Sequence, residues 1–285
     1  MARGLNVQLL IIDPQHDFMD YPDSNLAVPG ASADMDRAAT MLDRIWRRIN
    51  DTHVTVDSHP LPHIGHPLMW RGVDGNPPPP FTAIRAEDIR AGIWTPVHPH
   101  AKPAALQGKT ILQYVTDYAQ QLEDQGNHLL MIWPPHCLIG TPGHNVHTGL
   151  RQALMRWEAN AFATIDWVTK GTNPWTDQYG GLYAEVPMPN DPSTMLNTGL
   201  LKMLEEADIV GAFGEAESHC LRETLRQVKL NVDPSFISKI HLIRDCTSRI
   251  PKVGDGPDFP AITDAWEKEM QAAGMVITTS DEFLA

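Results

Sequence analysis

Five side chains of the types used in acyl transfer and metal binding are spread along the sequence: Asp13, Asp57, His136, Lys170 and Cys220. A thiolate attacks carbonyl carbons, a carboxylate takes the proton of a thiol, and an ammonium group stabilises nearby anions. A carboxylate combined with imidazoles binds Zn²⁺ or a similar metal. These residue types favour the hydrolysis of a carbonyl compound beside a metal.

Asp13 ends the apolar run of the segment IIDPQHDF. A carboxylate placed just past an apolar strand is partly desolvated, which raises its pKa and suits it to proton transfer. The alternative is a loop carboxylate that caps a backbone N–H.

A second segment, VDSHPLPHIGHP, offers metal ligands. Asp57 and His59 alternate on an extended chain and therefore project to the same side. His63 and His66 are close enough in sequence to add a ligand, and His136 in MIWPPHCLIG completes a candidate triad. A polar, histidine-rich surface turn is the alternative.

The nucleophile candidate is Cys220, in the segment GAFGEAESHCLRET. A strand runs into Gly214 and a helix begins near Ser218, so Cys220 is expected in the first helical turn, where free N–H groups stabilise a thiolate or an oxyanion. The alternative is a small buried hydrophobe. Cys137 follows His136 but points to the opposite face, and we expect it to be a packed thiol, as we do Cys246.

Lys170 ends another apolar run, in WVTKGTNPWTDQYGG. At the carboxyl end of a strand, a lysine can hold a carboxylate or lower the pKa of a thiol. A solvated surface lysine is the alternative.

The scaffold that positions these residues follows from alternating apolar runs and helical patterns. This order predicts an α/β protein with a three-layer α/β/α Rossmann-like fold and a mainly parallel sheet of six or slightly more strands, with helices on both faces. Ligands bind at the carboxyl ends of the strands of such a sheet. The expected strands are 7–12, 53–56, 128–133, 161–168, 207–213, 239–243 and 275–278, and the expected helices are 33–49, 110–124, 146–158, 193–206, 218–230 and 264–273.

One proline-rich stretch interrupts this alternation. We expect a single domain over residues 1–285, with an insertion at about 67–109 that is a loop or a small lid. A loop of this length covers a site or serves an oligomer contact, and a homo-oligomer is expected.

Composition restricts the partners. The net charge of −13 over 285 residues disfavours nucleic acid and anionic membranes. Three cysteines do not form a secreted disulfide framework, and no apolar segment approaches the roughly 18 residues of a membrane span. The initial apolar run is too short for a signal peptide, so we expect a cytoplasmic protein that acts on a small molecule.

Taken together, these segments resemble the nicotinamidases within the isochorismatase-like cysteine hydrolases. DPQHDF looks like the family's opening aspartate motif, VDSH followed by HI looks like its metal-binding turn, and WPPHCLIGTPG is close to its tryptophan-to-glycine signature. KGTNPWTDQYGG and GEAESHCLRET resemble its lysine and nucleophile segments. The resemblance spans the chain from Val7 to about Thr247, apart from the insertion.

The resemblance implies a thiol mechanism. It makes Cys220 the nucleophile, Asp13 the acceptor of its proton, and Lys170 the cation that orients both. The amides of Ala216 and Cys220 would form the oxyanion hole, and a cis peptide would precede Ala216.

The resemblance also implies a cofactor and a substrate pocket. The cofactor is a divalent metal, Zn with Fe or Mn as alternatives, held by Asp57, His59 and His136, with His63 as an optional fourth ligand. Phe18 and Trp133 would sandwich a flat heteroaromatic ring, with Gln15 as a further substrate-binding residue.

The expected activity is hydrolysis of a nicotinamide-like carboxamide to the acid and ammonia through a thioester, in NAD salvage. The sequence departs from the family's pattern in two places, and both concern the substrate. The insertion is longer, and Glu215 and Glu217 stand in place of an apolar residue and a threonine. Alternatives are an amidase for N-carbamoyl or other small linear amides, attack by a metal-bound hydroxide, and a binding protein without catalysis. Isochorismate-type vinyl ether hydrolysis does not call for a thiol.

Overall fold

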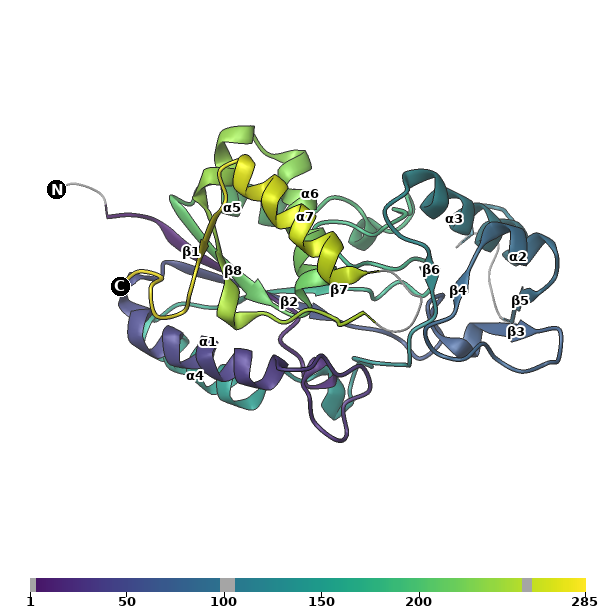
Figure 1. Ribbon diagram of the computed structural model, residues 1–285, viewed down its shortest axis with the longest axis horizontal. Helices are drawn as coiled ribbons and strands as arrows, with labels where there is room; N and C mark the ends of the chain where they lie inside the picture. The colour runs from purple at the N-terminus through teal and green to yellow at the C-terminus, as the bar shows by residue number, and fades with distance from the viewer. Residues whose placement is uncertain (1–3, 98–105, 253–257) are drawn as a thin grey trace.

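The computed structural model describes residues 4–97, 106–252 and 258–285. Six parallel strands form the central sheet in the order β10-β9-β8-β1-β2-β7 (Figure 1). The bounds of these strands are β1 Val7–Ile12, β2 Asp51–Asp57, β7 Asp166–Lys170, β8 Ile209–Gly214, β9 Ile240–Ile243 and β10 Val276–Thr278. The expected α/β/α fold with a six-stranded parallel sheet is confirmed.

The central strand β1 is apolar from Leu9 to Ile12 because both of its faces are covered. Alternate residues point to opposite sides of a strand. Leu9 and Ile11 belong to one core cluster, whereas Leu10 and Ile12 belong to a second. A parallel sheet buried on both faces needs such a continuous apolar run.

Helices from different parts of the chain cover the two faces (Figure 1). The first cluster includes residues of α1 (Ala31–Ile45) and α4 (Thr148–Ala161). The second includes residues of α5 (Thr198–Glu205), α6 (Arg222–Asn231) and α7 (Phe259–Ala272). Several connections contain short 3₁₀ helices, at His16–Phe18, Trp46–Arg48, Pro67–Met69, Pro142–His144, Pro192–Thr194, Pro234–Lys239 and Arg244–Cys246.

The helix expected at 110–124 forms as α3 (Ile111–Gln125), but the prediction that it covers the sheet is wrong. Its apolar stripe, which includes Tyr114 and Tyr118, packs with Trp70 and Ile84 in a third core cluster. Periodicity shows that a helix buries one face but not what that face packs against.

The apolar run at 128–133 also lies outside the central sheet. It contains the two-residue strand β6 (Leu130–Met131), which pairs antiparallel with β4 (Ala83–Ile84). The open sheet therefore has six strands, the lower limit of the expected number.

The 67–109 segment has regular structure of its own. It contains β3 (Trp70–Gly72), which pairs antiparallel with β5 (Trp94–Pro96), and the helix α2 (Ala86–Arg90); residues 98–105 lie outside the described part of the chain. Figure 1 shows these elements beside α3, at one end of the molecule. Among the described residues, no helix is both long and apolar enough to cross a membrane.

Candidate active site

Four of the expected site residues meet at the carboxyl edge of the central sheet. Asp13 follows β1, and Asp57 and Lys170 are register partners at the ends of β2 and β7. The strand β8 pairs with β1 and leads into the turn that carries Cys220. Because all four strands run in parallel, their ends deliver these side chains to one place.

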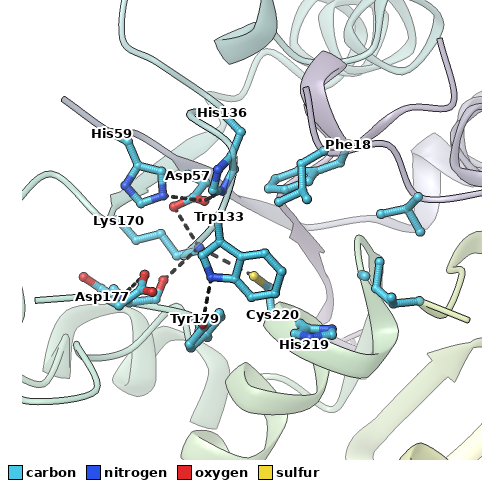
Figure 2. A pocket seen from close by; sticks show the side chains of 15 residues that line it. Phe18, Asp57, His59, Trp133, His136, Lys170, Asp177, Tyr179, His219 and Cys220 are labelled. Carbon is cyan, nitrogen blue, oxygen red and sulfur yellow. Dashed lines mark hydrogen bonds and ion pairs between the residues drawn. The ribbon is translucent and has the colours of Figure 1, made fainter. Parts of the chain in front are cut away.

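Lys170 is the centre of this group and is almost fully buried. Its Nζ lies 2.9 Å from Asp13 Oδ2, and it donates to Asp57 Oδ1 at 3.1 Å and to the backbone oxygen of Gln178 at 3.0 Å. Cys220 Sγ is 3.8 Å from the same nitrogen (Figure 2). One ammonium group thus contacts two carboxylates and the thiol, so the solvated-lysine alternative does not hold.

Burial sets the protonation states around this lysine. It raises the pKa of the Cys220 thiol well above its usual value, although Lys170 opposes the shift, and it raises the pKa of Asp13. Burial lowers the pKa of Lys170, but Asp13 and Asp57 outweigh it, so this pKa is well above its usual value. The resting site therefore holds a protonated thiol beside a cationic lysine, with Asp13 next to both.

Cys220 lies just before α6, in the segment that follows β8. A π-helical turn, Glu217–Leu221, follows β8, and Cys220 lies within this first turn of the helical segment, as expected. The peptide bond between Glu215 and Ala216 is cis, which confirms the cis bond that the resemblance implied.

A group of metal-ligating side chains adjoins Lys170. One donor atom from each of Asp57, His59 and His136 lies within 4.8 Å of the others. His59 Nε2 is 2.9 Å and His136 Nε2 is 3.3 Å from the same carboxylate oxygen, Asp57 Oδ2. The other ring nitrogens lie 3.0 Å from the backbone oxygen of Gly171 and 2.8 Å from that of Pro134.

These contacts fit a metal ion. Because a carbonyl oxygen only accepts hydrogen bonds, each histidine carries a proton on Nδ1, and a neutral ring then presents the lone pair of Nε2. In that form both lone pairs would face the Asp57 carboxylate, and a bound cation would satisfy all three donors. Histidine ligands of metals are commonly oriented by a carbonyl in this way.

Gly171 makes the packing of this group possible. Its φ of +72° lies in the region that favours glycine, and a Cβ atom there would lie 2.6 Å from the His59 ring. The Lys-Gly pair that ends β7 therefore serves both the lysine site and the histidine site.

His63 and His66 lie beside these donors but outside the converging group. The His63 ring is 4.4 Å from that of His59; His63 Nε2 is 3.3 Å from the Thr176 backbone oxygen, and Nδ1 accepts from the Gly65 N–H at 3.2 Å. Burial lowers the pKa of His63 well below its usual value and that of His66 to about 3. His63 has both ring nitrogens occupied, which does not support the optional fourth ligand.

A small cavity of about 50 Å³ opens between Cys220 and the metal-ligating group (Figure 2). Phe18, Trp133 and Ala216 contribute to its lining. Its apolar walls suit a small flat molecule.

Gln15 has a different place from the one expected. Its side chain accepts a hydrogen bond from the backbone N–H of Asp57 at 2.6 Å and donates one to the backbone oxygen of Asp57 at 2.7 Å. Gln15 is absent from the described lining of the cavity. Gln15 therefore holds the backbone of Asp57, because its amide is fully used by main-chain groups.

Several lining residues were not anticipated. Tyr179 accepts a hydrogen bond from Trp133 Nε1 at 2.9 Å, and His219 packs edge-on against the same tryptophan. Asp177 and Gln178 also line the cavity. Three of these four lie in KGTNPWTDQYGG, from which the sequence pattern singled out only the lysine. The other cysteines, Cys137 and Cys246, are buried in the first core cluster as packed thiols.

Comparison with known proteins adds evidence on the fold. No family model and no curated protein matches the sequence. The yeast nicotinamidase bound to the inhibitor nicotinaldehyde superposes with a TM-score of 0.59 at 18% identity, over 96% of this chain and 99% of that one. The L. infantum protein PnC1 in complex with nicotinate has a TM-score of 0.56 at 20% identity, over 99% of this chain and 98% of that one.

A third solved structure, the pyrazinamidase of Pyrococcus horikoshii in complex with zinc, has a TM-score of 0.51 at 18% identity. It covers 96% of this chain and 99% of that one. At such identities the likeness concerns the fold. This chain therefore has the fold found in nicotinamidases and pyrazinamidases, over nearly its whole length.

Proposed function

We propose that this protein is a cysteine amidohydrolase that cleaves a small, flat carboxamide, such as nicotinamide, to the acid and ammonia. The observation that carries the proposal is the buried Lys170, whose Nζ lies 2.9 Å from Asp13 and 3.8 Å from Cys220 Sγ beside an apolar cavity. A lysine, an acid and a thiol in mutual reach supply a nucleophile, its base and a fixed cation.

Acylation begins with the protonated thiol. As Cys220 Sγ attacks the amide carbon, Asp13 takes the thiol proton, and the cation on Lys170 stabilises the negative charge that passes between them. The amides of Ala216 and Cys220 stabilise the oxyanion. Asp13 then returns the proton to the departing nitrogen, the C–N bond breaks, and ammonia leaves a thioester behind.

Deacylation uses the same groups in reverse. Asp13 removes a proton from water, the resulting hydroxide attacks the thioester, and the C–S bond breaks. The proton passes to the sulfur, which restores the thiol and releases the acid.

The donor set of Asp57, His59 and His136 would hold a divalent metal, with Zn favoured over Fe or Mn for a carboxylate and two imidazoles. The zinc complex of the Pyrococcus horikoshii pyrazinamidase, which shares this fold, supports that choice. A bound metal would act as a Lewis acid that orients the ring of the substrate. Phe18 and Trp133 would hold that ring in place.

The proposal is tested by assaying ammonia release from nicotinamide, pyrazinamide, benzamide and an N-carbamoyl amino acid, with the metal content measured on the same sample. We expect turnover of the aromatic amides, with about one metal per chain. Cys220→Ala should abolish turnover and keep the metal, whereas Cys137→Ala, a change at another buried thiol, should remain active.

Two outcomes would reject the proposal. If Cys220→Ala keeps a turnover that chelation abolishes, a metal-bound hydroxide is the nucleophile. If the amides bind without ammonia release, the protein is a binding protein.

A further inference from the structure

A second cavity, of about 470 Å³, adjoins the catalytic pocket. Trp133, Tyr179 and His219 line both spaces and form the wall between them. Arg222 at the start of α6 and Phe259 at the start of α7 also line the second cavity. We call this space the outer cavity.

Arg222 brings to the outer cavity a positive charge that no described side chain pairs with directly. Within the described chain, its side chain makes no hydrogen bond or ion pair, and its Nε is buried without a partner. Leaving a partly buried charge unpaired is costly, so such a group is suited to an anion supplied from outside.

The neighbouring carboxylates are already engaged, including Glu123, which lines the outer cavity and accepts the Ala86 N–H at 2.7 Å. Glu223 receives two hydrogen bonds from Arg226, at 2.6 Å from its terminal nitrogen and 2.9 Å from its Nε, and one from Asn127 at 2.9 Å. Glu185 accepts the Tyr179 N–H at 3.3 Å, and burial raises its pKa to about 7. Neither Glu223 nor Glu185 lies within ion-pair distance of Arg222.

His219 supplies a neutral donor in the shared wall. The Ser218 hydroxyl accepts from the Ile250 N–H at 3.1 Å, and its described acceptor is His219 Nδ1 at 2.9 Å. This network assigns the proton of His219 to Nε2, which has no partner among the described residues. Burial lowers the pKa of His219 to about 3, so the ring is a neutral N–H donor.

The remaining walls are flat rings. The His219 and Phe259 ring centroids are 4.4 Å apart, and His128 stacks on Tyr179 at 4.5 Å. Aromatic faces bind planar ligands by stacking and edge contacts.

We propose that the outer cavity is a second binding site, for an aromatic carboxylate held by the Arg222 guanidinium and the ring walls. The choice of ligand deepens the proposed function, because hydrolysis of an aromatic carboxamide releases an acid of this class. The protein would then bind two acid molecules per chain, one at Cys220 and one at Arg222.

The test is calorimetric titration of benzoate into the Cys220→Ala protein, which cannot turn over an amide, with benzamide as the neutral counterpart. We expect two molecules of benzoate but one of benzamide per chain. Arg222→Gln should remove the second benzoate or weaken it by about tenfold or more, and Arg222→Lys, which retains the charge but not the planar fork, should keep a weaker second site.

Lys229→Gln is the matched control. It removes one positive charge from a neighbouring cavity, which Arg222 also lines, and should leave two benzoate sites. The proposal would be overturned if Arg222→Gln left the number of benzoate molecules bound by the Cys220→Ala protein unchanged and each affinity within about twofold. Ammonia release is measured separately on the wild-type protein, so failure of the proposed amidase activity would not be mistaken for failure of this site.

Discussion

Two groups of three side chains in this molecule have the composition of a metal site, and only one is arranged like one. In the described chain, these are Asp57, His59 and His136 at the sheet edge, and His128, Glu185 and Glu223 beside the outer cavity, which His128 lines. Both groups are largely buried, and in each group the donor atoms lie within 4.8 Å of one another.

The difference lies in what the remaining hydrogen-bonding atoms do. At the sheet edge, backbone oxygens bind the Nδ1 atoms of His59 and His136, so their Nε2 atoms face Asp57 Oδ2. In the second group, Arg226 and Asn127 donate to Glu223. Cationic and amide donors thus satisfy the carboxylate that a metal would need. Proximity of ligand types is therefore not enough, and the outer contacts decide whether lone pairs remain free for a metal.

The largest expected effect follows from Asp57→Asn. One carboxylate oxygen of Asp57 contacts Lys170 and the other faces both histidines. The neutral Asn side chain should therefore lower the rate of substrate hydrolysis by about a thousandfold or more and release the metal. Ammonia release and metal content on one sample measure this. Glu223→Gln is the counterpart in the second group, and it should lower the melting temperature but leave the metal content unchanged. Metal loss in Glu223→Gln would break the comparison.

Histidine truncation sharpens the same contrast. His59→Ala should weaken metal binding by at least about a hundredfold, because it removes a ligand rather than an outer contact. His128 is the histidine of the second group, and the His128→Ala variant should bind metal as tightly as the parent protein does. Metal affinity measured by competition with a chelator separates the two, and equal losses would mean that both groups bind metal.

The second group is expected to act on the pocket through Tyr179, on which His128 stacks. Tyr179→Phe removes the acceptor of the Trp133 indole N–H, a contact of 2.9 Å. Loss of one neutral hydrogen bond is worth about 1 kcal/mol, so KM for the amide should rise about fivefold while kcat stays within about twofold. A fall in kcat with unchanged KM would place Tyr179 in the chemistry instead of the wall.

The smallest effect concerns stability and pH. Burial raises the pKa of Glu185 to about 7 from an ordinary value of 4.5, so the folded protein holds this proton more tightly than the unfolded chain. The free energy of unfolding therefore decreases as the pH rises from about 4.5 to 7. The Glu185→Gln variant lacks this titrating carboxyl group. Its free energy of unfolding, relative to that of the parent, should therefore increase between pH 5 and pH 8, as measured in urea melts. Parallel stability curves for the two proteins would contradict the assignment.

Much of the fold and part of the site follow from local sequence. The apolar runs that end at Asp13 and Lys170 mark strands because their neighbours are turn residues, and parallel strands end at one edge of a sheet. The strand and turn before Cys220 are equally local. The sequence by itself therefore determined which residues gather at that edge, together with the α/β/α layering.

The tertiary structure alone decided which partners these residues have. Asp57 joins Lys170 to the histidines, Gln15 holds the Asp57 backbone instead of lining the pocket, and α3 packs on the 67–109 segment rather than on the sheet. Arg222 remains without an ion pair in the described chain, although acids adjoin it in sequence and in space. Each outcome depends on distances between segments that are far apart in the chain, whereas periodicity and spacing report only on neighbours along it.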